Sequence, residues 1–503
     1  MMMRKYITIQ NNETIDFRTI PSLEYKEFLE TNILFLKDVN NHCVNYFGFP
    51  YAGKLKLVCC IANDSKARIK LTCADINIGT NDVYPSLSAH NLALNIFERE
   101  LSENFGIKYS DHPWLKPVRY PVDRFDKSSQ ISNYPFYQIE SEELHEVGVG
   151  PIHAGIIEPG HFRFICKGEQ ILHLEIQLGY QHRGIEKLFL EKNKLLQRVI
   201  LAESIAGDTT VGHASAFANI WESLCGFEPD EELRFVRTIA LELERIAIHT
   251  GDLSAICGDV AYQLGSSVFS RLRTPVINFF QAWCGNRLAK GLIRPIVNNY
   301  IFTSELRKLL LKILDEYEPD FNEMIKKLFH NPGCLVRFEK TGVVSYGQAL
   351  KIGAVGMTAK ASGLNRDIRL SHPSDLYKNF VHQPVIKHHG DVFSRTQIRR
   401  EEILQSIAYI RSILEKIPPH QNRKEISPKP RENAFTISLV EGWRGEICHC
   451  AVTNELGELI NYKVKDPSFH NWLALALAVR RNGISDFPIC NKSFNLSYCG
   501  FDL

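Results

Sequence analysis

The chain has 503 residues, of which 44% are hydrophobic and 23% are charged, and its formal net charge is +2. This length exceeds that of one ordinary domain, and the composition is typical of a folded globular protein. The small net charge removes any electrostatic argument for nucleic acid as a partner. The longest apolar runs, 57–62 and 472–479, are far shorter than the roughly 20 residues of a membrane-spanning helix. We therefore expect the protein to meet a membrane only through partner subunits.

The N-terminal segment and the cysteines indicate a cytoplasmic protein. The start of the chain, MMMRKYITIQ, has no continuous apolar core of the kind found in secretion signals. The 13 cysteines include no Cys-x-x-Cys pair, so we interpret them as reduced thiols that mostly fill the core. The string Cys448-His449-Cys450 contains metal-ligating residue types. Its spacing differs from that of common metal-binding pairs, however, and alternation along a strand explains it more simply.

Residues 1–125 predict a small α/β unit. Strand-like segments occur at 6–10, 54–62 and 67–76, and a helical pattern covers 86–106. Gly106 at the end of that pattern is typical of a helix C-terminus. Residues 126–146 are polar and weakly patterned, so we expect them to form a linker.

The remainder, residues 147–503, predicts a large, mainly helical domain flanked by antiparallel sheet. Strand-like text at 161–180 precedes the helical patterns, and a strand-rich section with a turn at NELGEL follows them at 434–465. The helical patterns cover 185–204, 213–225, 231–252 and 304–329. No internal repeat of fixed period occurs. We therefore expect the fold class to be α+β.

Two strings at the start of the large domain carry residues suited to proton transfer. In GVGPIHAGIIEPGHFRF, His153 and His161 bracket a turn rich in Gly and Pro, and imidazoles titrate near neutral pH. In GYQHRGIEKL, Arg183 and Glu186 lie three residues apart, so the arginine can fix an anion while the glutamate relays protons. The simpler alternatives are that the histidines cap strand ends and that Arg183 and Glu186 form an ordinary surface pair.

Two later strings add further polar groups. LERIAIHTGDLSAICGDV places Asp259 after an apolar helix that contains His249, and a histidine in that setting is more often a satisfied core residue. KASGLNRDIRLSHP predicts a polar, Gly-broken loop that carries Arg366 and Asp367. Each of these strings is a weak signal on its own.

Taken together and in this order, the strings resemble one protein family. GPIHAG, EPGHFRF and GYQHRGIEKL are followed by ELERIAIH, SGLNRDIR and HHGDVFSRTQIRREEI. This wording is similar to that of the large subunits of energy-converting nickel-iron hydrogenases, especially the formate hydrogenlyase and hydrogenase-4 type, and of the related quinone-site subunit of respiratory complex I. Residues 95–125 resemble a second complex I subunit, which is fused at the N-terminus in that type. The resemblance covers nearly the whole chain and implies a hydrogenase large-subunit fold.

The chain departs from the hydrogenase pattern at the metal ligands. In the hydrogenases two Cys-x-x-Cys pairs hold nickel and iron, because four thiolates suit soft metals. The four matching positions here carry other residues, namely Ala206, Thr209, Ser497 and Gly500. Cys490 and Cys499 are nine residues apart, and two thiols so placed would have to replace four. We therefore expect no nickel-iron centre, and a working hydrogenase with unusual ligands is only a third hypothesis.

The resemblance identifies AESIAGDTTVGH, residues 202–213, as the first metal-binding loop with its ligands replaced. Gly207 and His213 remain at matching positions, and Asp208 and Thr209 add polar groups to the emptied position. A buried aspartate requires a partner or a raised pKa. We expect His213 or Arg183 to be the partner of Asp208.

In the quinone-site relative from complex I the emptied position is a quinone pocket, built from a histidine, an aspartate and a tyrosine. The resemblance implies that His153 or His161 supplies the histidine and that Asp259 supplies the aspartate. The tyrosine is missing, because Lys194 and Leu195 stand at the matching positions. Its loss removes a proton donor beside the headgroup and weakens the case for quinone reduction.

The leading prediction is therefore the large subunit of a membrane-associated, complex I-like oxidoreductase without a nickel-iron centre or any cofactor of its own. Electrons would come from an iron–sulfur cluster in a small partner subunit and pass to a quinone or another acceptor. Further complex I-like soluble subunits and antiporter-like membrane subunits would complete the assembly, on the inner face of the cytoplasmic membrane. We expect the catalytic residues to be His153, His161, Asp259, Arg183 and Glu186. We expect the cavity-lining residues to be Asp208, Thr209, His213, Arg366 and Asp367.

The alternative prediction is a non-catalytic structural or coupling subunit that links soluble partners to an ion-translocating membrane arm. The missing tyrosine and cysteines favour it. The retained polar groups argue against it, because a buried polar group without a partner costs about 1–3 kcal/mol. Convergence of these side chains on one cavity would favour the first prediction, and their separation would favour the second.

Overall fold

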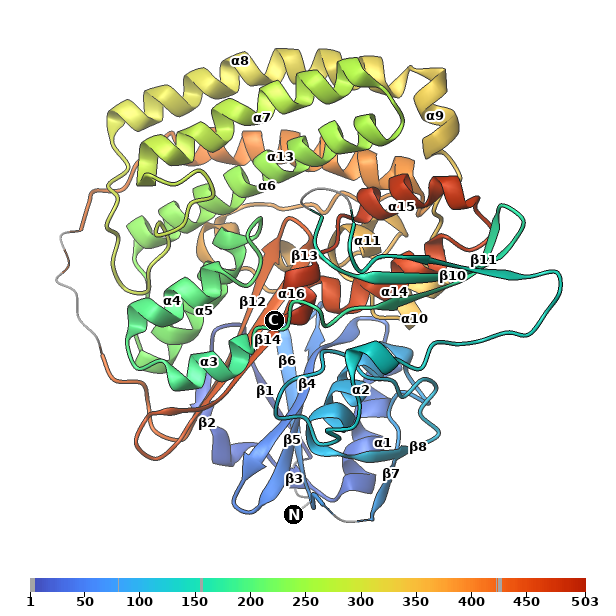
Figure 1. The fold of residues 1–503 in the computed structure, drawn as a ribbon. Coiled ribbons are helices and arrows are strands. Elements are labelled where there is room, and N and C mark those ends of the chain that lie inside the picture. Colours follow the sequence, from blue (N-terminus) through green and yellow to red (C-terminus); the bar gives the residue numbers. More distant parts are fainter. Residues whose placement is uncertain (1–4, 80, 154–156, 422, 424–427) are drawn as a thin grey trace.

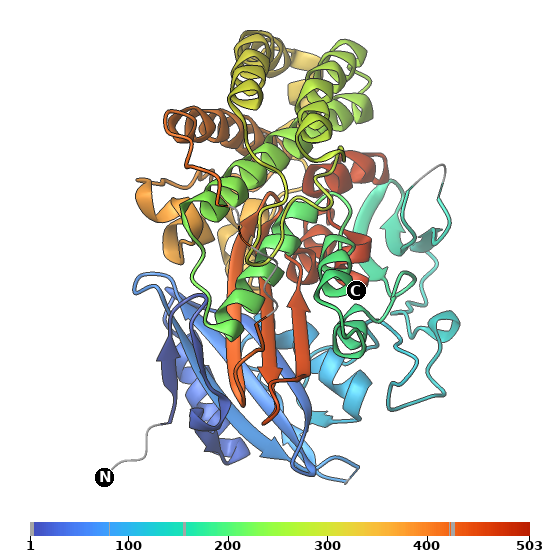
Figure 2. The same ribbon diagram turned by 90° about the vertical axis from the view of Figure 1, so that its left-hand side faces the viewer.

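The computed structural model describes residues 5–79, 81–153, 157–421, 423 and 428–503. Two β-sheets pack face to face, one formed by N-terminal residues and one mainly by C-terminal residues (Figure 1). Long helices cover the other face of the C-terminal sheet, which therefore lies between the helices and the N-terminal unit (Figure 2). The α+β class expected from the sequence is confirmed.

The N-terminal sheet has the strand order β1-β6-β5-β4, and β3 pairs with β6. Its strands are β1 (Ile7–Ile9), β3 (Ser22–Leu23), β4 (Asn41–Tyr51), β5 (Lys54–Asn63) and β6 (Arg68–Ile76). Helix α1 (Tyr25–Leu36) and helix α2 (Asn95–Phe105) cover one face, and the C-terminal sheet covers the other. Both faces are therefore buried, which explains the near-continuous apolar text of β5. Gly106, in the left-handed conformation with φ 70°, ends α2 as expected.

The C-terminal sheet has the order β14-β13-β12-β2. Its strands are β12 (Ala434–Gly442), β13 (Gly445–Thr453), β14 (Leu459–Lys465) and β2 (Thr14–Asp16). Because β2 comes from the start of the chain, the first residues belong to this sheet as well as to the N-terminal one. The tight turn between β12 and β13 holds only Trp443 and Arg444, and it points these side chains toward the helices.

The helical layer surrounds the largest hydrophobic core of the described chain. Its helices are α5 (Thr210–Cys225), α6 (Glu231–Asp259), α7 (Gln263–Cys284), α8 (Ser304–Phe329) and α13 (Val392–Ile413). The Asp230 side chain caps α6 by accepting a hydrogen bond from Leu233 N at 3.0 Å, and Thr303 caps α8 in the same way. None of the described helices is long and apolar enough to cross a membrane.

The remaining elements connect these layers. A three-stranded sheet consists of β9 (His145–Val149), β10 (His161–Lys167) and β11 (Gln170–Gln177), and β7 (Val83–Pro85) pairs with β8 (Lys108–Ser110). The shorter helices are α3 (Ile185–Glu191), α4 (Leu195–Glu203), α9 (Pro332–Phe338), α10 (Tyr346–Lys351), α11 (Gly356–Ala361), α12 (Ile368–Ser371), α14 (Ser468–Ala478), α15 (Phe487–Phe494) and α16 (Tyr498–Asp502).

Two sequence expectations differ from the structure. The helix predicted at 185–204 is two helices, α3 and α4, because Lys192 and Lys194 adopt extended backbone conformations between them. The sequence patterns also did not predict helices α7 and α13. The proposed linker, 126–146, contains a short 3-10 turn at Ile131–Asn133 and is otherwise irregular up to β9. The division at residues 125 and 146 remains a prediction.

Candidate functional site

The two loops that match the metal-binding cysteine pairs lie next to each other. The first loop joins α4 to α5, and the second runs from Asn495 into the first turn of α16 at the C-terminus, so that Gly500 lies within α16. Arg183 bridges them, since its guanidinium donates hydrogen bonds to the carbonyl oxygens of Ser204 (2.5 Å), Ile205 (2.9 Å) and Cys499 (3.1 Å). Arg183 therefore fixes the relative position of the two loops. The anion-binding role expected for Arg183 stays a prediction.

A second arginine, Arg444, occupies the space at the first loop. Its two terminal nitrogens contact the two carboxylate oxygens of Asp208 at 2.7 and 2.5 Å, and one of them also donates to Thr209 Oγ1 at 3.0 Å. The guanidinium stacks on the ring of Trp443, whose indole N–H donates to the Asp208 carbonyl oxygen at 2.8 Å. The void beside Gly207 and Asp208 holds only about 10 Å³.

The expected partner of Asp208 was therefore wrong. Neither His213 nor Arg183 pairs with it, because the β12–β13 turn brings Arg444 there from a point more than 200 residues along the chain. The Asp208 side chain is 36% exposed, whereas Arg444 is buried. Burial alone would lower the pKa of Arg444, but the charge and hydrogen bonds of Asp208 outweigh that effect and raise this pKa above its usual range. Arg444 is therefore permanently cationic.

The second loop is closed by an aspartate. Asp466, which follows β14, accepts a hydrogen bond from Ser468 N at 2.7 Å. A Cβ atom added at Gly500 would lie 2.7 Å from Asp466 Cγ and 2.8 Å from Ser497 Oγ. A cysteine therefore does not fit at Gly500 while Asp466 keeps its position. Asp466 belongs to a buried chain of polar side chains that also includes His213, His449 and Tyr462.

The residues of a nickel-iron centre thus do not fit here. The four matching positions carry no thiol, and a guanidinium and a carboxylate fill the space where ligands would converge. Cys490 is buried in α15 beside Gly342, whereas Cys499 contacts Ser497 Oγ at 3.4 Å. Among the described residues, no group of three or more His, Cys, Asp or Glu side chains could hold a metal ion.

The Cys448-His449-Cys450 string alternates along β13. Both thiols face the N-terminal sheet, where Asn45 Nδ2 lies 3.6 Å from Cys448 Sγ and 3.7 Å from Cys450 Sγ. His449 points to the opposite face, toward α5. The three side chains therefore cannot bind one metal ion together. Alternation along a strand, the simpler of the two interpretations drawn from the sequence, is the one that the structure shows.

His153 and His161 form hydrogen bonds to backbone carbonyl oxygens of their own loop. His153 Nε2 lies 2.9 Å from the Gly160 carbonyl oxygen, and His161 Nδ1 lies 2.8 Å from the Gly150 carbonyl oxygen. A carbonyl oxygen only accepts, so each of these ring nitrogens donates. The other nitrogen of His161, Nε2, has no hydrogen-bond partner among the described residues. Residues 154–156 of this loop lie outside the described residues.

Glu186 lies at a different place, in a cavity of about 660 Å³ between the N-terminal unit and the C-terminal sheet. We call this the interdomain cavity; its walls come from β4, α2, α3 and β14. Glu186 accepts a hydrogen bond from Val464 N at 2.9 Å and pairs with Lys463 at 3.2 Å. Lys463 also contacts Glu100, which in turn pairs with Arg119. Glu186 therefore belongs to a charge chain of the interdomain cavity and does not pair with Arg183 as an i,i+3 neighbour.

Asp259 is the last residue of α6, and it is exposed. Partial burial raises its pKa above the usual range, and the nearby Lys492 opposes that rise. No described contact joins Asp259 to His153 or His161 within the chain. A quinone headgroup site that used Asp259 together with His153 or His161 would therefore need a further wall from residues other than these three.

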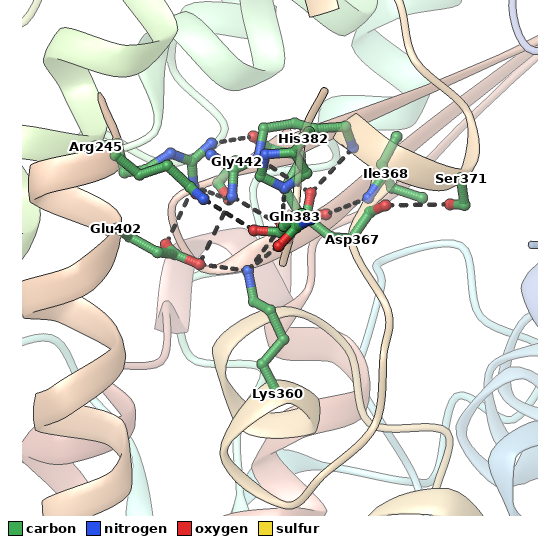
Figure 3. A network of polar contacts seen from close by, with 12 residues as sticks. Arg245, Lys360, Asp367, Ile368, Ser371, His382, Gln383, Glu402 and Gly442 are labelled. Carbon is green, nitrogen blue, oxygen red and sulfur yellow. Dashed lines mark hydrogen bonds and ion pairs between the residues drawn. The ribbon is translucent and has the colours of Figure 1, made fainter. Parts of the chain in front are cut away.

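Asp367 belongs to a buried charged cluster that lies where α6, α11, α13 and β12 meet (Figure 3). Lys360 Nζ lies 2.5 Å from Glu402, 3.2 Å from Asp367 and 3.4 Å from Glu441. The remaining charged and polar partners in the cluster are Arg245, Arg369, Glu242, His249 and His382. Arg366 adjoins this cluster and donates to the Ala354 carbonyl oxygen at 3.2 Å. Asp367 thus lies in the packed interior and does not line an open cavity.

The sequence-predicted residues are therefore distributed over several places. Asp208, Thr209, His213 and Arg183 surround the altered metal position, whereas Glu186, Asp259 and the pair Arg366–Asp367 lie elsewhere. Sequence reasoning missed Arg444 and Asp466. No local pattern signals them, because each reaches the site from a turn or strand end whose position depends on the whole sheet.

Comparison with protein families matches residues 259–502 to the respiratory-chain NADH dehydrogenase 49 kDa subunit and residues 25–135 to the 30 kDa subunit. The chain is 28% identical to hydrogenase-4 component G of Escherichia coli strain K12, over 77% of this chain and 67% of that protein. It is 27% identical to formate hydrogenlyase subunit 5 of the same organism, over 82% of this chain and 76% of that protein. It is 26% identical to the C/D subunit of NADH-quinone oxidoreductase from Phocaeicola vulgatus, over 72% of this chain and 76% of that protein.

Proposed function

We propose that the chain is the large subunit of a complex I-like, hydrogenase-related oxidoreductase. Two observations support this proposal: the matches to the 49 kDa and 30 kDa subunits of respiratory-chain NADH dehydrogenase, and the similarity to hydrogenase-4 component G and formate hydrogenlyase subunit 5. In this proposal an iron–sulfur subunit delivers electrons, and a quinone or another small acceptor receives them beside this chain. Membrane subunits of the antiporter type and other soluble subunits complete the assembly at the inner face of the cytoplasmic membrane.

The observation that carries the proposal is the Arg444–Asp208 pair at the altered metal position. It retains charge and hydrogen-bonding groups where two loops meet, and the crowding at Gly500 supports a site without thiolate ligands at the matching positions. An acceptor would then bind against the outer side of this position, where a partner subunit supplies the missing wall. The fixed positive charge of Arg444 would favour the reduced, anionic form of an acceptor at short range.

His161 is the best candidate for a proton donor to that acceptor. Its Nδ1 donates to the Gly150 carbonyl oxygen, so the ring has one orientation, and its buried Nε2 has no hydrogen-bond partner among the described residues. In the protonated ring Nε2 carries a hydrogen that can be donated. His153, held by Gly160, is its matched control because the Nε2 atom of His153 is already engaged.

The second candidate function is a non-catalytic coupling subunit. One observation favours it: the predicted polar residues do not converge on one cavity, because Asp367 is packed in the charged cluster and Glu186 lies in the interdomain cavity. In a coupling subunit these charge networks would stiffen the contact between soluble partners and the membrane arm, with no acceptor bound.

The experiment that separates the two candidates is a turnover measurement on the complex purified in mild detergent with its native partners. We would reduce the complex and follow a water-soluble quinone as acceptor, comparing wild type with His161→Ala and His153→Ala. The first candidate predicts turnover that falls by about 100-fold in His161→Ala and by much less in His153→Ala. No turnover in an intact wild-type complex, offered several acceptor classes, would favour the coupling function.

A further inference from the structure

Four buried side chains form one continuous hydrogen-bonded chain that the proposed function does not use. Asp466 Oδ2 lies 3.1 Å from His213 Nε2, and His213 Nδ1 lies 3.1 Å from His449 Nε2. His449 Nδ1 lies 2.8 Å from the Tyr462 hydroxyl. Both imidazoles are 0% exposed, and Asp466 and Tyr462 are buried as well. Every nitrogen of the two rings is therefore engaged within the chain of four.

The hydrogen positions along this chain follow from what each group can do. A carboxylate only accepts, so His213 Nε2 donates to Asp466, which leaves Nδ1 of a neutral His213 as an acceptor. His449 Nε2 must then be the donor to His213, and its Nδ1 accepts from the Tyr462 hydroxyl. Burial tends to raise the pKa of Asp466, but the hydrogen bond from His213, the nearby charge of Arg444 and the hydrogen bond from Ser468 keep it below its usual value. All three links thus point the same way, from Tyr462 to Asp466.

The hydrogen-bonded series of four side chains has one end at the interdomain cavity and the other at the altered metal position. Asp466 stands against Gly500, at the second loop of the altered metal position. Tyr462 stacks on Phe189 with the ring centroids 4.1 Å apart and forms part of the wall of the interdomain cavity. Its strand neighbour Lys463 pairs with Glu186 and Glu100 in that cavity. The four side chains therefore run along the helix-facing side of the C-terminal sheet, from the wall of the interdomain cavity to the second loop.

We propose that Tyr462, His449, His213 and Asp466 form a proton relay between the interdomain cavity and the altered metal position. This inference rests on the proposed function, because reduction of an acceptor such as a quinone consumes protons. In one transfer, the proton on Tyr462 passes to His449 Nδ1, that on His449 Nε2 passes to His213 Nδ1, and that on His213 Nε2 passes to Asp466. A hydronium ion in the cavity restores the tyrosine proton, and Asp466 passes its proton on to the reduced acceptor. Both rings then return from the Nδ1–H to the Nε2–H tautomer before the next transfer, so one proton moves and no electrons change place.

The transfers have to be concerted. Burial raises the pKa of Tyr462 well above its usual range and lowers that of His449, so a free tyrosinate or a free His449 imidazolium is costly. Each imidazole instead gains a proton on one nitrogen as it loses one on the other, and both rings remain neutral. A chain of pre-aligned hydrogen bonds in a water-free setting supports such a step.

Glutamine at position 449 distinguishes a relay from a purely structural network. The amide of His449→Gln can donate to His213 and accept from Tyr462, but it cannot exchange one proton for another. His449→Leu breaks both bonds. A relay predicts that His449→Gln retains the thermal stability of wild type but loses about tenfold or more in acceptor turnover, close to the loss in His449→Leu. Wild-type turnover in His449→Gln would overturn the relay.

A second measurement decides the question even if the complex transfers no electrons to any acceptor tested. ¹⁵N spectra of the full chain labelled on histidine report which ring nitrogen carries the proton, and the His213 and His449 signals are assigned by their loss in His213→Gln and His449→Gln. The relay predicts that both rings are neutral with the proton on Nε2 at pH 7. A His213 that stays charged across the neutral range, or a His449 protonated on Nδ1 alone, would reverse the direction of the chain and overturn the proposal.

Discussion

At the scale of single residues, the altered metal position depends on one cation from a distant turn. Arg444 makes two contacts to Asp208 and one to Thr209, and it also donates to the Asn495 carbonyl oxygen at 2.5 Å. It therefore links the first loop to the second through side chain and backbone together. Removal of either member of the ion pair leaves the other with an uncompensated charge, and the cost is greater for the buried arginine than for the partly exposed aspartate.

A double-mutant cycle tests this linkage. Arg444→Met keeps the bulk of the side chain but removes its charge, and we expect it to lower the free energy of unfolding by about 2–3 kcal/mol. Asp208→Asn is expected to cost more, because it leaves the buried Arg444 without its carboxylate. The loss of unfolding free energy in the double variant should be smaller than the summed losses of the two single variants by roughly 1 kcal/mol or more, as measured by denaturant unfolding. Strict additivity would show that the two side chains do not interact.

The closed second loop gives a matched pair of glycine substitutions. Gly500→Ala places a Cβ atom 2.7 Å from Asp466 Cγ, so we expect about 1–3 kcal/mol of destabilisation from overpacking. Gly207→Ala in the first loop is the control, because no atom lies within 4 Å of its added Cβ. The control should change the unfolding free energy by less than about 0.5 kcal/mol. Equal effects of the two substitutions would mean that Asp466 is not packed against Gly500.

Much of the residue-level description could be predicted from the sequence, and the failures have one cause. Asp208, Thr209 and His213 lie together between the end of α4 and the first turn of α5, as their spacing in the sequence indicated, and their assignment to the altered metal position stays a prediction. The partner of Asp208 was wrongly assigned, because Arg444 arrives through the β12–β13 turn. Pairing across a sheet depends on register and turn geometry, which a local pattern does not determine.

At the scale of elements, the charged cluster between α6, α11, α13 and β12 is the most unusual contact in the molecule. Three cations, Arg245, Lys360 and Arg369, face four carboxylates, which are Glu242, Asp367, Glu402 and Glu441. One proton on the carboxylates would balance these charges. Burial and the neighbouring Asp367 raise the pKa of Glu441 to about 7, so we assign this proton to Glu441 among the four carboxyls.

Glu441→Gln tests that assignment through pH. The pKa of Glu441 in the folded protein lies above the ordinary value of 4.5. Below pH 4.5 its carboxyl therefore does not lower the free energy of unfolding, whereas between pH 4.5 and pH 7 it lowers that free energy increasingly. We therefore expect Glu441→Gln to match wild type at pH 4.5 and to exceed it in unfolding free energy at pH 8, by on the order of 3 kcal/mol. The measurement is denaturant unfolding at both pH values.

Glu402→Gln is the contrasting variant in the same cluster. Although burial opposes it, Lys360, His249 and the arginines hold the pKa of Glu402 well below its usual range. Its loss should destabilise the protein by about 3–5 kcal/mol at pH 7, because the buried Lys360 loses its nearest carboxylate. A Glu441→Gln variant that behaves like Glu402→Gln, destabilised at neutral pH, would contradict the assignment of the proton.

At the scale of the whole molecule, the two stacked sheets are joined by an ion pair as well as by apolar contacts. His42 of β4 lies 2.7 Å from Glu446 of β13 and 3.2 Å from Asp64, which follows β5, and Lys465 also contacts Glu446. Burial of the ring lowers the pKa of His42, but the two carboxylates outweigh that effect and raise it to about 9. His42 is therefore a cation in the sheet interface at neutral pH.

The raised pKa of His42 predicts a window of pH dependence. The stabilisation that the charged His42 ring gives to the folded protein is complete below pH 6.5, the ordinary pKa of histidine. It is lost as the pH rises through about 9, the pKa of His42 in the folded protein. The difference in unfolding free energy between wild type and His42→Gln should therefore shrink between pH 6.5 and pH 9.5. His112→Gln is the control: burial lowers the pKa of His112 to about 4, so its difference from wild type should stay constant over this window. A constant difference for His42→Gln would show that His42 is not a buried cation.

The overall architecture was largely predictable, and its assembly was not. The strands at 54–62, 67–76 and 434–465 and the helix at 304–329 are where the sequence indicated them, because their hydrophobic periodicity is strong. The entry of β2 into the C-terminal sheet had no such signal, since Thr14–Asp16 is three residues long and its pairing with β12 spans more than 400 residues. Contacts of this range depend on the folded whole.

A guanidinium–carboxylate pair lies at the position that the sequence resemblance assigns to metal ligands, so we expect the proposed large subunit to work without nickel. The most direct test is elemental analysis of the complex purified in mild detergent with its native partners. We expect nickel far below one atom per chain, together with iron from the partner subunit. One nickel atom per chain, lost when Cys490 and Cys499 are replaced by serine, would contradict this expectation.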